Sequence, residues 1–101
     1  MRKMIAGFLL AVFTSPSAFA QGTACAERAE AEPSYPYKLV THFTLELSAR
    51  EADGRIGKAA YDAAMAELSK ANTELTSLRT AEGCRILERI ASQYRLAPPG
   101  R

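Results

Sequence analysis

The chain has 101 residues, with 13 basic and 11 acidic side chains, one histidine and two cysteines. That length allows one domain at most. Acidic and basic residues alternate along the chain, so no basic surface indicates a nucleic acid or an anionic membrane as the partner.

The N-terminal residues have the order of an export signal. Two basic residues precede an apolar stretch over residues 4–13, and the small residues Ala18 and Ala20 follow. This order is typical of a cleavable signal peptide, and the apolar stretch is shorter than the roughly 20 residues that span a membrane. We therefore expect cleavage of residues 1–20, no stable membrane anchor afterwards, and a periplasmic or secreted protein.

The two cysteines, Cys25 and Cys84, predict one intramolecular disulfide. Cleavage leaves 101 less 20, or 81, residues with 11 basic and 11 acidic side chains. A core of that size supplies only about 3–5 kcal/mol, so small exported domains usually add a covalent link. The cysteines lie 59 residues apart (84 less 25), and closing that loop stabilises the fold by about 4 kcal/mol. The alternatives are an intermolecular bridge, free thiols, or a lipid on Cys25, although Gly22 stands where a lipoprotein has leucine.

Residues 21–36 are predicted to form an N-terminal adapter segment. Residues 24–32 are rich in alanine and glutamate and favour a short helix, which Pro33 and Pro36 end. An alternative use of this region is an exposed, rigid Tyr35-Pro36-Tyr37 segment that binds a target enzyme.

Residues 37–47 fit either a helix or a strand. Apolar and polar residues alternate there, as in a half-buried strand. Four of the apolar residues also share one helical face: Leu39, Val40, Phe43 and Leu47. A strand needs a partner for its backbone groups, and the rest of the chain offers none. We therefore favour the helix, with a strand paired across a dimer as the alternative.

A long helix is predicted to follow and to end near Leu78. Ser48 and Glu51 have the spacing of a capping box, whereas Gly54 favours a start nearer Arg55. Apolar residues then recur at spacings of four and three, as in a packed helical face. We call six of them the seam and regard it as a candidate interaction surface: Tyr61, Ala64, Leu68, Ala71, Leu75 and Leu78.

A last helix is predicted over residues 83–96, after a turn at residues 80–83. Its apolar stripe comprises Cys84, Leu87, Ala91 and Tyr94, widened by Ile86 and Ile90. Residues 98–101 are predicted to be a disordered tail, and residues 37–97 to form the helical domain. The fold class is all-α: a small helical hairpin or three-helix domain with one disulfide.

No residue pattern indicates catalysis, a cofactor or a metal. His42 is the only histidine, and Glu46, four residues later on a helix, is expected to pair with it. A zinc site needs three or four ligands, and the single histidine supplies only one. The turn around Gly54 resembles part of a calcium loop, but Ala49 and Ala60 occupy the positions of essential carboxylates. Met65 is interpreted as core filler.

These observations favour a small exported, non-enzymatic protein that binds another protein, or itself, in the cell envelope. The predicted last helix is shorter than the long helix, so we expect part of the seam to remain uncovered. A periplasmic acid-stress chaperone and a secreted enzyme inhibitor are the alternatives.

Overall fold

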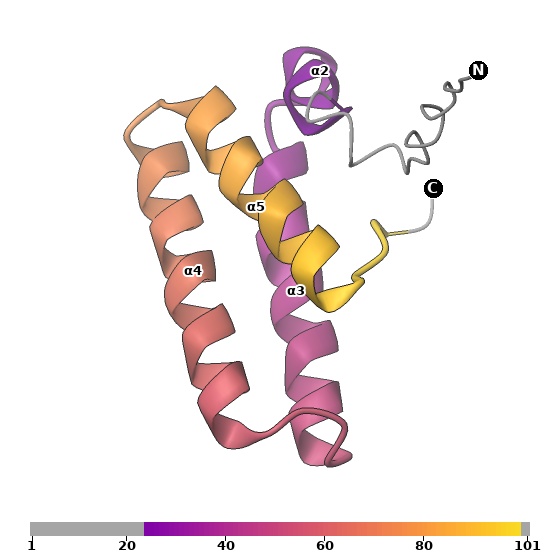
Figure 1. Ribbon diagram of the computed structural model, residues 1–101. Coiled ribbons are helices and arrows are strands. Elements are labelled where there is room, and N and C mark those ends of the chain that lie inside the picture. The colour runs from indigo at the N-terminus through magenta and orange to yellow at the C-terminus, as the bar shows by residue number, and fades with distance from the viewer. Residues whose placement is uncertain (1–23, 100–101) are drawn as a thin grey trace, which may run out of the picture.

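The computed structural model describes residues 24–99, which form four helices and no strand (Figure 1). The helices are α2 (Ala24–Ala31), α3 (Tyr35–Ala52), α4 (Lys58–Thr76) and α5 (Thr80–Tyr94). The predicted all-α class is confirmed for this part of the chain. The predicted signal peptide, with Ala18 and Ala20, lies outside the described residues.

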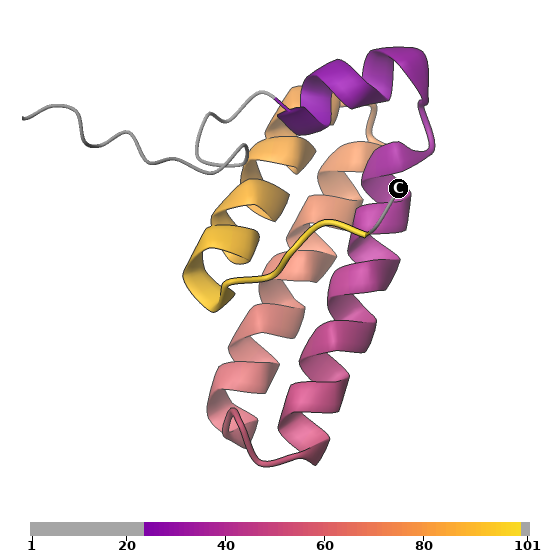
Figure 2. The same cartoon turned by 90° about the vertical axis from the view of Figure 1, so that its right-hand side faces the viewer.

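Three of the helices form a bundle, and the fourth crosses one end of it. α3 and α4 form an antiparallel hairpin, and α5 turns back to pack against both (Figure 1). α2 lies across the end of the bundle where α3 begins and contacts α3 and α5 (Figure 2). The core therefore lies between α3, α4 and α5, as in the three-helix version of the predicted fold.

α3 settles the ambiguous segment as a helix. Leu39, Phe43 and Leu47 are completely buried and lie four residues apart on one face. Pro36 stands in the first turn of the helix, where its missing N–H has no partner to lose. The helix therefore begins before the predicted segment and presents the helical face that the sequence indicated.

The capping box predicted at Ser48 is wrong, because α3 continues through this residue to Ala52. The Ser48 hydroxyl lies 3.1 Å from the Tyr61 hydroxyl of α4 instead of capping a helix. The chain turns after Ala52, where Gly54 adopts a left-handed backbone with φ of 77°, a conformation that glycine adopts without strain. α4 then starts at Lys58, three residues later than the predicted Arg55.

The turn between α4 and α5 brings these two helices very close together. α5 begins at Thr80, before the predicted Gly83, so Gly83 lies inside the helix. A Cβ atom at Gly83 would lie 2.6 Å from Cδ2 of Leu75. The glycine therefore permits a close helix contact that a larger residue would prevent.

α5 ends in a cap, and the chain then crosses α3. Arg95 adopts a left-handed backbone with φ of 56°, and the Leu96 N–H donates to the Ala91 carbonyl at 2.9 Å. This arrangement satisfies carbonyls at the helix end, and Leu96 is buried. We call residues 95–99 the C-terminal segment, which passes over α3 in Figure 2. The predicted tail extends to residues 100 and 101, which lie outside the described range.

Candidate functional site

The predicted disulfide is present and joins α2 to α5. The Cα atoms of Cys25 and Cys84 lie 5.6 Å apart, an ordinary separation for a disulfide. Both cysteines are buried. The chain has no other cysteine, so this bond accounts for both thiols.

A buried carboxylate lies beside the disulfide. Glu88, on α5, is only 6% exposed. Its Oε2 atom accepts the backbone N–H of Cys25 at 3.1 Å, and its Oε1 atom is buried with no hydrogen-bond partner. Burial raises the pKa of this carboxyl, and the hydrogen bond from Cys25 offsets part of the rise. Sequence reasoning missed Glu88, although its position four residues after Cys84 places it on the buried side of α5.

The expected pair of His42 and Glu46 does not form. The His42 Nε2 atom lies 3.1 Å from the carbonyl oxygen of Ala97, and Glu46 pairs with Arg50, with 3.9 Å between Oε1 and Nη2. The helix does place the two residues four apart, but the histidine contacts the C-terminal segment instead of Glu46. His42 therefore holds the C-terminal segment against α3.

Arg50 holds the end of α5 and was also missed by sequence reasoning. Its guanidinium donates to the carbonyls of Tyr94 and Arg95. Last carbonyls of a helix lack partners within the helix, and a cationic donor satisfies them. Arg50 lies three residues after the buried Leu47, and this spacing was the signal that its side chain turns toward the bundle.

Within residues 24–99, no three histidine, cysteine, aspartate or glutamate side chains are grouped so that they could hold a metal ion. Asp53, in the turn compared with a calcium loop, instead pairs with Arg55 at 2.9 Å. Met65 packs half-buried against the core.

Most of the seam is covered by the chain itself. Four seam residues are buried in the core: Ala64, Leu68, Ala71 and Leu75. Tyr61 is half-buried, and Leu78 is 87% exposed because α4 ends at Thr76 and the chain turns away. The expectation that part of the seam stays uncovered counted one partner helix, whereas α3 and α5 both pack against α4.

The Tyr35-Pro36-Tyr37 segment is not an exposed strap. Tyr35 and Pro36 are buried in the first turn of α3, and the Arg28 guanidinium stacks 4.4 Å from the centre of the Tyr35 ring. Only Tyr37 is exposed, at 39%. The inhibitor alternative therefore loses the exposed, rigid segment on which it depended.

The structure does expose a different apolar surface, on the side of α3 that faces away from the bundle. We call it the α3 outer face and define it by five exposed, uncharged residues: Tyr37, Thr41, Leu45, Ala49 and Ala52. Leu45, at its middle, is 65% exposed. Lys38, seven residues before Leu45, lies on the same side of the helix and pairs with Glu32. In the sequence, spacings of four and three place these residues on one helical face, but only the packing of the bundle shows that this face is exposed.

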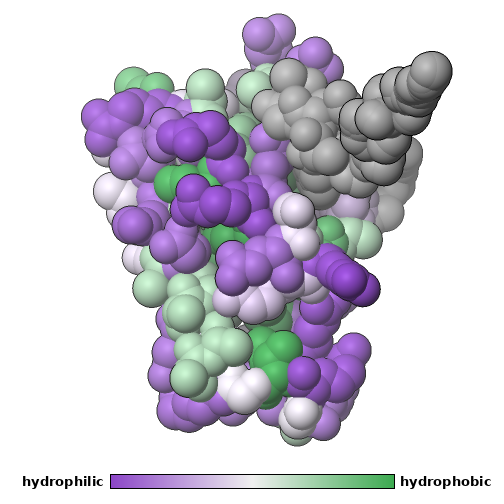
Figure 3. All heavy atoms as spheres, in the orientation of Figure 1, coloured by the Kyte–Doolittle hydropathy of each residue, from purple (hydrophilic) through white to green (hydrophobic). Residues whose placement is uncertain are grey.

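The outer sides of the other two bundle helices carry charges. Asp62 and Lys70 are exposed on α4, and Arg85 and Arg89 on α5. Figure 3 shows this side of the molecule, with hydrophilic residues over α5 and mildly hydrophobic ones over the lower part of α4. A surface helix of a globular protein normally has polar and charged residues on its solvent side. α4 also exposes an uncharged stripe, at Ala59, Ala63 and Ala66. The α3 outer face differs because it exposes large apolar side chains, Tyr37 and Leu45.

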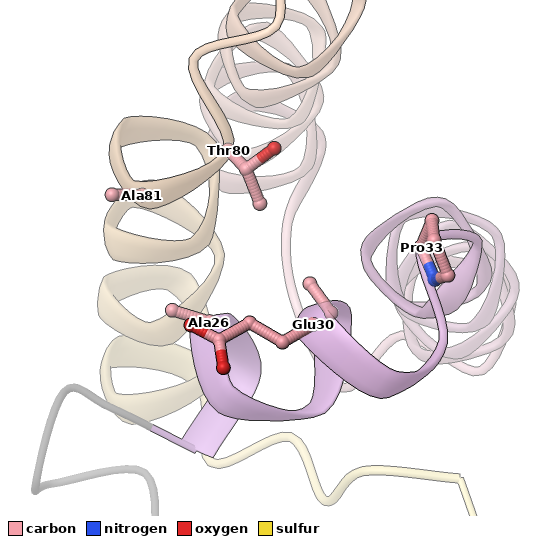
Figure 4. Close-up of a pocket in the computed structure, with 6 residues that line it drawn as sticks. Ala26, Glu30, Pro33, Thr80 and Ala81 are labelled. Atoms are coloured by element: carbon pink, nitrogen blue, oxygen red, sulfur yellow. The ribbon is translucent and has the colours of Figure 1, made fainter.

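A shallow hollow of about 340 Å³ lies between α2 and the start of α5 (Figure 4). It is lined by Ala26, Ala29, Glu30, Pro33, Thr80 and Ala81. Glu30 supplies the single charged group among small and apolar neighbours. One exposed carboxylate without a second titrating group offers no acid–base pair.

No helix in the described part of the chain is long and apolar enough to cross a membrane. Comparison with known proteins yields no match among the protein-family models, the curated proteins or the solved structures.

Proposed function

We propose that the chain is an exported, non-enzymatic protein that binds another protein in the cell envelope, through the α3 outer face. One observation carries the proposal: an exposed helical surface with Leu45 at its centre, whose five defining residues are uncharged. Contiguous exposed apolar surface of this kind marks protein interaction sites. The polar residues next to it, His42 and Arg50, are half-buried and hold the C-terminal segment.

Export to the periplasm or the exterior is supported by the disulfide and by the N-terminal signal pattern. Disulfides persist in oxidising compartments and are rare in the cytosol. The bond between Cys25 and Cys84 joins a short helix to the bundle, as expected for a small domain that needs a covalent link. Mass spectrometry of the protein from its native envelope fraction tests this part. We expect a chain that begins at Gln21 and has both cysteines oxidised, whereas an intact, reduced chain in the cytosol contradicts export.

Site-specific photo-crosslinking in the native envelope tests the binding surface. A photoreactive phenylalanine derivative replaces Leu45 in one variant and Thr73, exposed on α4, in a matched control. We expect protein adducts from position 45 well above those from position 73. Equal or absent adducts at position 45 contradict the proposal.

An acid-stress chaperone is a second candidate, favoured by the ion pair between Glu67 of α4 and Arg89 of α5. The hydrogen bond from Arg89 lowers the pKa of the Glu67 carboxyl, so the pair is lost only when acid protonates it. Its loss would remove one polar contact between α4 and α5 at the protein surface. This role requires the mature protein to slow aggregation of a test client at pH of about 2–3, and no effect there excludes it.

A further inference from the structure

We infer that α2 is a redox-controlled cover on the bundle. While Cys25 and Cys84 are bonded, α2 stays docked on α5; when a dithiol reductant breaks the bond, α2 detaches and leaves α3, α4 and α5 folded. The inference goes beyond the proposed binding function and does not depend on the α3 outer face. Three features of the junction between α2 and α5 support it: the side chains that α2 buries, the carboxylate of Glu88, and the hollow.

α2 makes few contacts that hold it without the disulfide. It buries only Cys25 and Ala29, and Ala29 lines the hollow. The Arg28 guanidinium stacks on the Tyr35 ring, but Arg28 is exposed, and such a contact is weak at an exposed site. An eight-residue helix is not stable alone. Breaking the disulfide therefore removes the main attachment of α2.

Glu88 opposes the docking of α2. Its Oε2 atom accepts the Cys25 N–H, so the carboxylate lies against α2, but its Oε1 atom is buried with no hydrogen-bond partner. A carboxylate without a full set of partners destabilises the state that buries it. When α2 detaches, water reaches the carboxylate and replaces the Cys25 N–H. Glu88 therefore favours release once the covalent bond is broken.

The hollow shows that α2 packs loosely over the start of α5 (Figure 4). Its volume is about 340 Å³, whereas closely packed protein interiors leave few voids larger than a water molecule. The contact between α4 and α5 is the opposite case, because a Cβ atom at Gly83 would already collide with Leu75. The disulfide therefore fastens the loosely packed helix to the closely packed part of the fold.

Reduction requires α2 to open first, because both cysteines are buried. Opening of a small unit needs less free energy than global unfolding. A thiolate of the reductant then attacks one sulfur of the bond and forms a mixed disulfide, and the displaced cysteine takes up a proton. The second thiol of the reductant attacks the reductant's own sulfur in the mixed disulfide. This step releases the other cysteine as a thiol and the reductant as a disulfide, so two electrons and two protons have passed to Cys25 and Cys84.

Reduction of the folded protein by dithiothreitol, at a series of urea concentrations below the unfolding transition, tests local opening. Alkylation and mass spectrometry count the free thiols over time, and circular dichroism gives the equilibrium unfolding curve of the oxidised protein. Opening of α2 exposes little surface, so we expect the reduction rate to rise with urea at less than about one third of the slope for global unfolding. Equal slopes would show that the bond is reached only by global unfolding and would overturn the inference.

Two variants test the role of Glu88 in release. Glu88→Gln keeps an acceptor for the Cys25 N–H but removes the buried charge, so α2 docks more firmly and reduction should slow about threefold or more. Glu82→Gln removes an equal charge at a surface position of the same helix and should leave the rate unchanged. Equal effects of the two variants, or faster reduction of Glu88→Gln, contradict this role.

Hydrogen exchange of the reduced protein, kept under dithiothreitol, tests what remains folded. We expect α2 to lose its protection and the buried amides of α3, α4 and α5 to retain theirs. Reoxidation should restore the protection of α2. Loss of protection throughout the bundle would show that the disulfide holds the whole fold and does not control α2 alone, which overturns the inference. None of these outcomes changes the cross-linking expected at position 45, so the binding function and the cover can fail separately.

Discussion

The two ends of the described chain both fold back over the bundle, but they are held by different means. α2 is attached to α5 by the disulfide between Cys25 and Cys84 and by the Glu88 carboxylate. The C-terminal segment is attached to α3 by hydrogen bonds from Arg50 and His42 and by the burial of Leu96. One end depends on a covalent bond, and the other depends on packing and hydrogen bonds alone.

The difference follows from what each end buries. α2 has eight residues and buries only Cys25 and Ala29, and helices this short are not stable alone. Chain separation does not distinguish the two ends, because Cys25 and Cys84 lie 59 residues apart and the C-terminal segment contacts His42 across 55 residues. The buried side chains do differ in size: α2 buries a cysteine and an alanine, whereas the C-terminal segment buries Leu96. The covalent link is therefore found at the end whose buried side chains are small.

Removing the disulfide is expected to have the largest effect. The double variant Cys25→Ser, Cys84→Ser loses about 4 kcal/mol of unfolding free energy because the unfolded chain gains freedom. For a domain of this size, the thermal midpoint then falls by about 15–30 °C. Hydrogen exchange should show early loss of protection in α2, with the C-terminal segment still protected. Equal loss at both ends would contradict their independence.

Truncation of Leu96 is expected to have the next largest effect. Leu96→Ala removes a buried side chain and costs about 2–4 kcal/mol, from lost burial and the cavity left behind. The exposed Leu78 provides a matched control, because Leu78→Ala removes the same atoms from solvent-exposed surface. Chemical denaturation measures both. A cost for Leu78→Ala as large as that for Leu96→Ala would show that the C-terminal segment does not contribute by burial.

Arg50 is expected to contribute less than Leu96. Arg50→Met keeps most of the side-chain stem but removes the donors to Tyr94 and Arg95, at a cost of about 1.5–3 kcal/mol. Arg55→Met, in the exposed turn after α3, removes an equal charge and should change the free energy of unfolding by less than about 0.5 kcal/mol. Faster exchange in the C-terminal segment, with α2 unchanged, is the expected pattern. Equal losses in the two variants would exclude a capping role for Arg50.

Glu88 is expected to have the smallest effect at neutral pH but a distinct pH dependence. Its folded-state pKa is raised above the ordinary 4.5, so the folded protein binds this proton before the unfolded chain does. Stability from this group therefore increases as pH falls from the raised pKa toward 4.5. Glu88→Gln keeps an acceptor for the Cys25 N–H and should remove this rise.

The exposed ion-paired carboxylates provide the opposite control for Glu88. The hydrogen bond from Arg85 lowers the pKa of Glu82, so stability from that pair is present above about pH 4.5 and is lost as pH falls through the lowered pKa. Glu82→Gln should therefore reduce stability above that range and leave the Glu88 rise intact. Denaturation from pH of about 3 to 8 measures both profiles, and an unchanged profile in Glu88→Gln would exclude its contribution.

The sequence predicted the fold class and the disulfide because each depends on a strong local or compositional signal. The spacing of Leu39, Phe43 and Leu47 fitted a helix as well as a strand, and the lack of a partner strand favoured the helix. Two cysteines allow one pairing within the chain. Helix boundaries were less readable. Ser48 has the residue type and spacing of a cap, but continuing α3 satisfies the same backbone groups within the helix.

The candidate surface could not be assigned from the sequence, because exposure depends on how many helices pack together. The seam on α4 and the α3 outer face are both apolar stripes, and only the bundle decides which one is buried. Glu88 and Arg50 show the same limit. Each lies on a buried side of its helix, but their partners are a backbone N–H and two carbonyls from distant segments.

The position of the disulfide has one more consequence, for proteolysis. The bond encloses α3, α4 and the exposed turn at Arg55, since it links Cys25 to Cys84. A trypsin-like enzyme that cuts after Arg55 therefore produces two pieces that stay covalently attached until a reductant separates them. A cut after Arg95 lies outside this ring, so only the burial of Leu96 and the contact with His42 would retain the final residues.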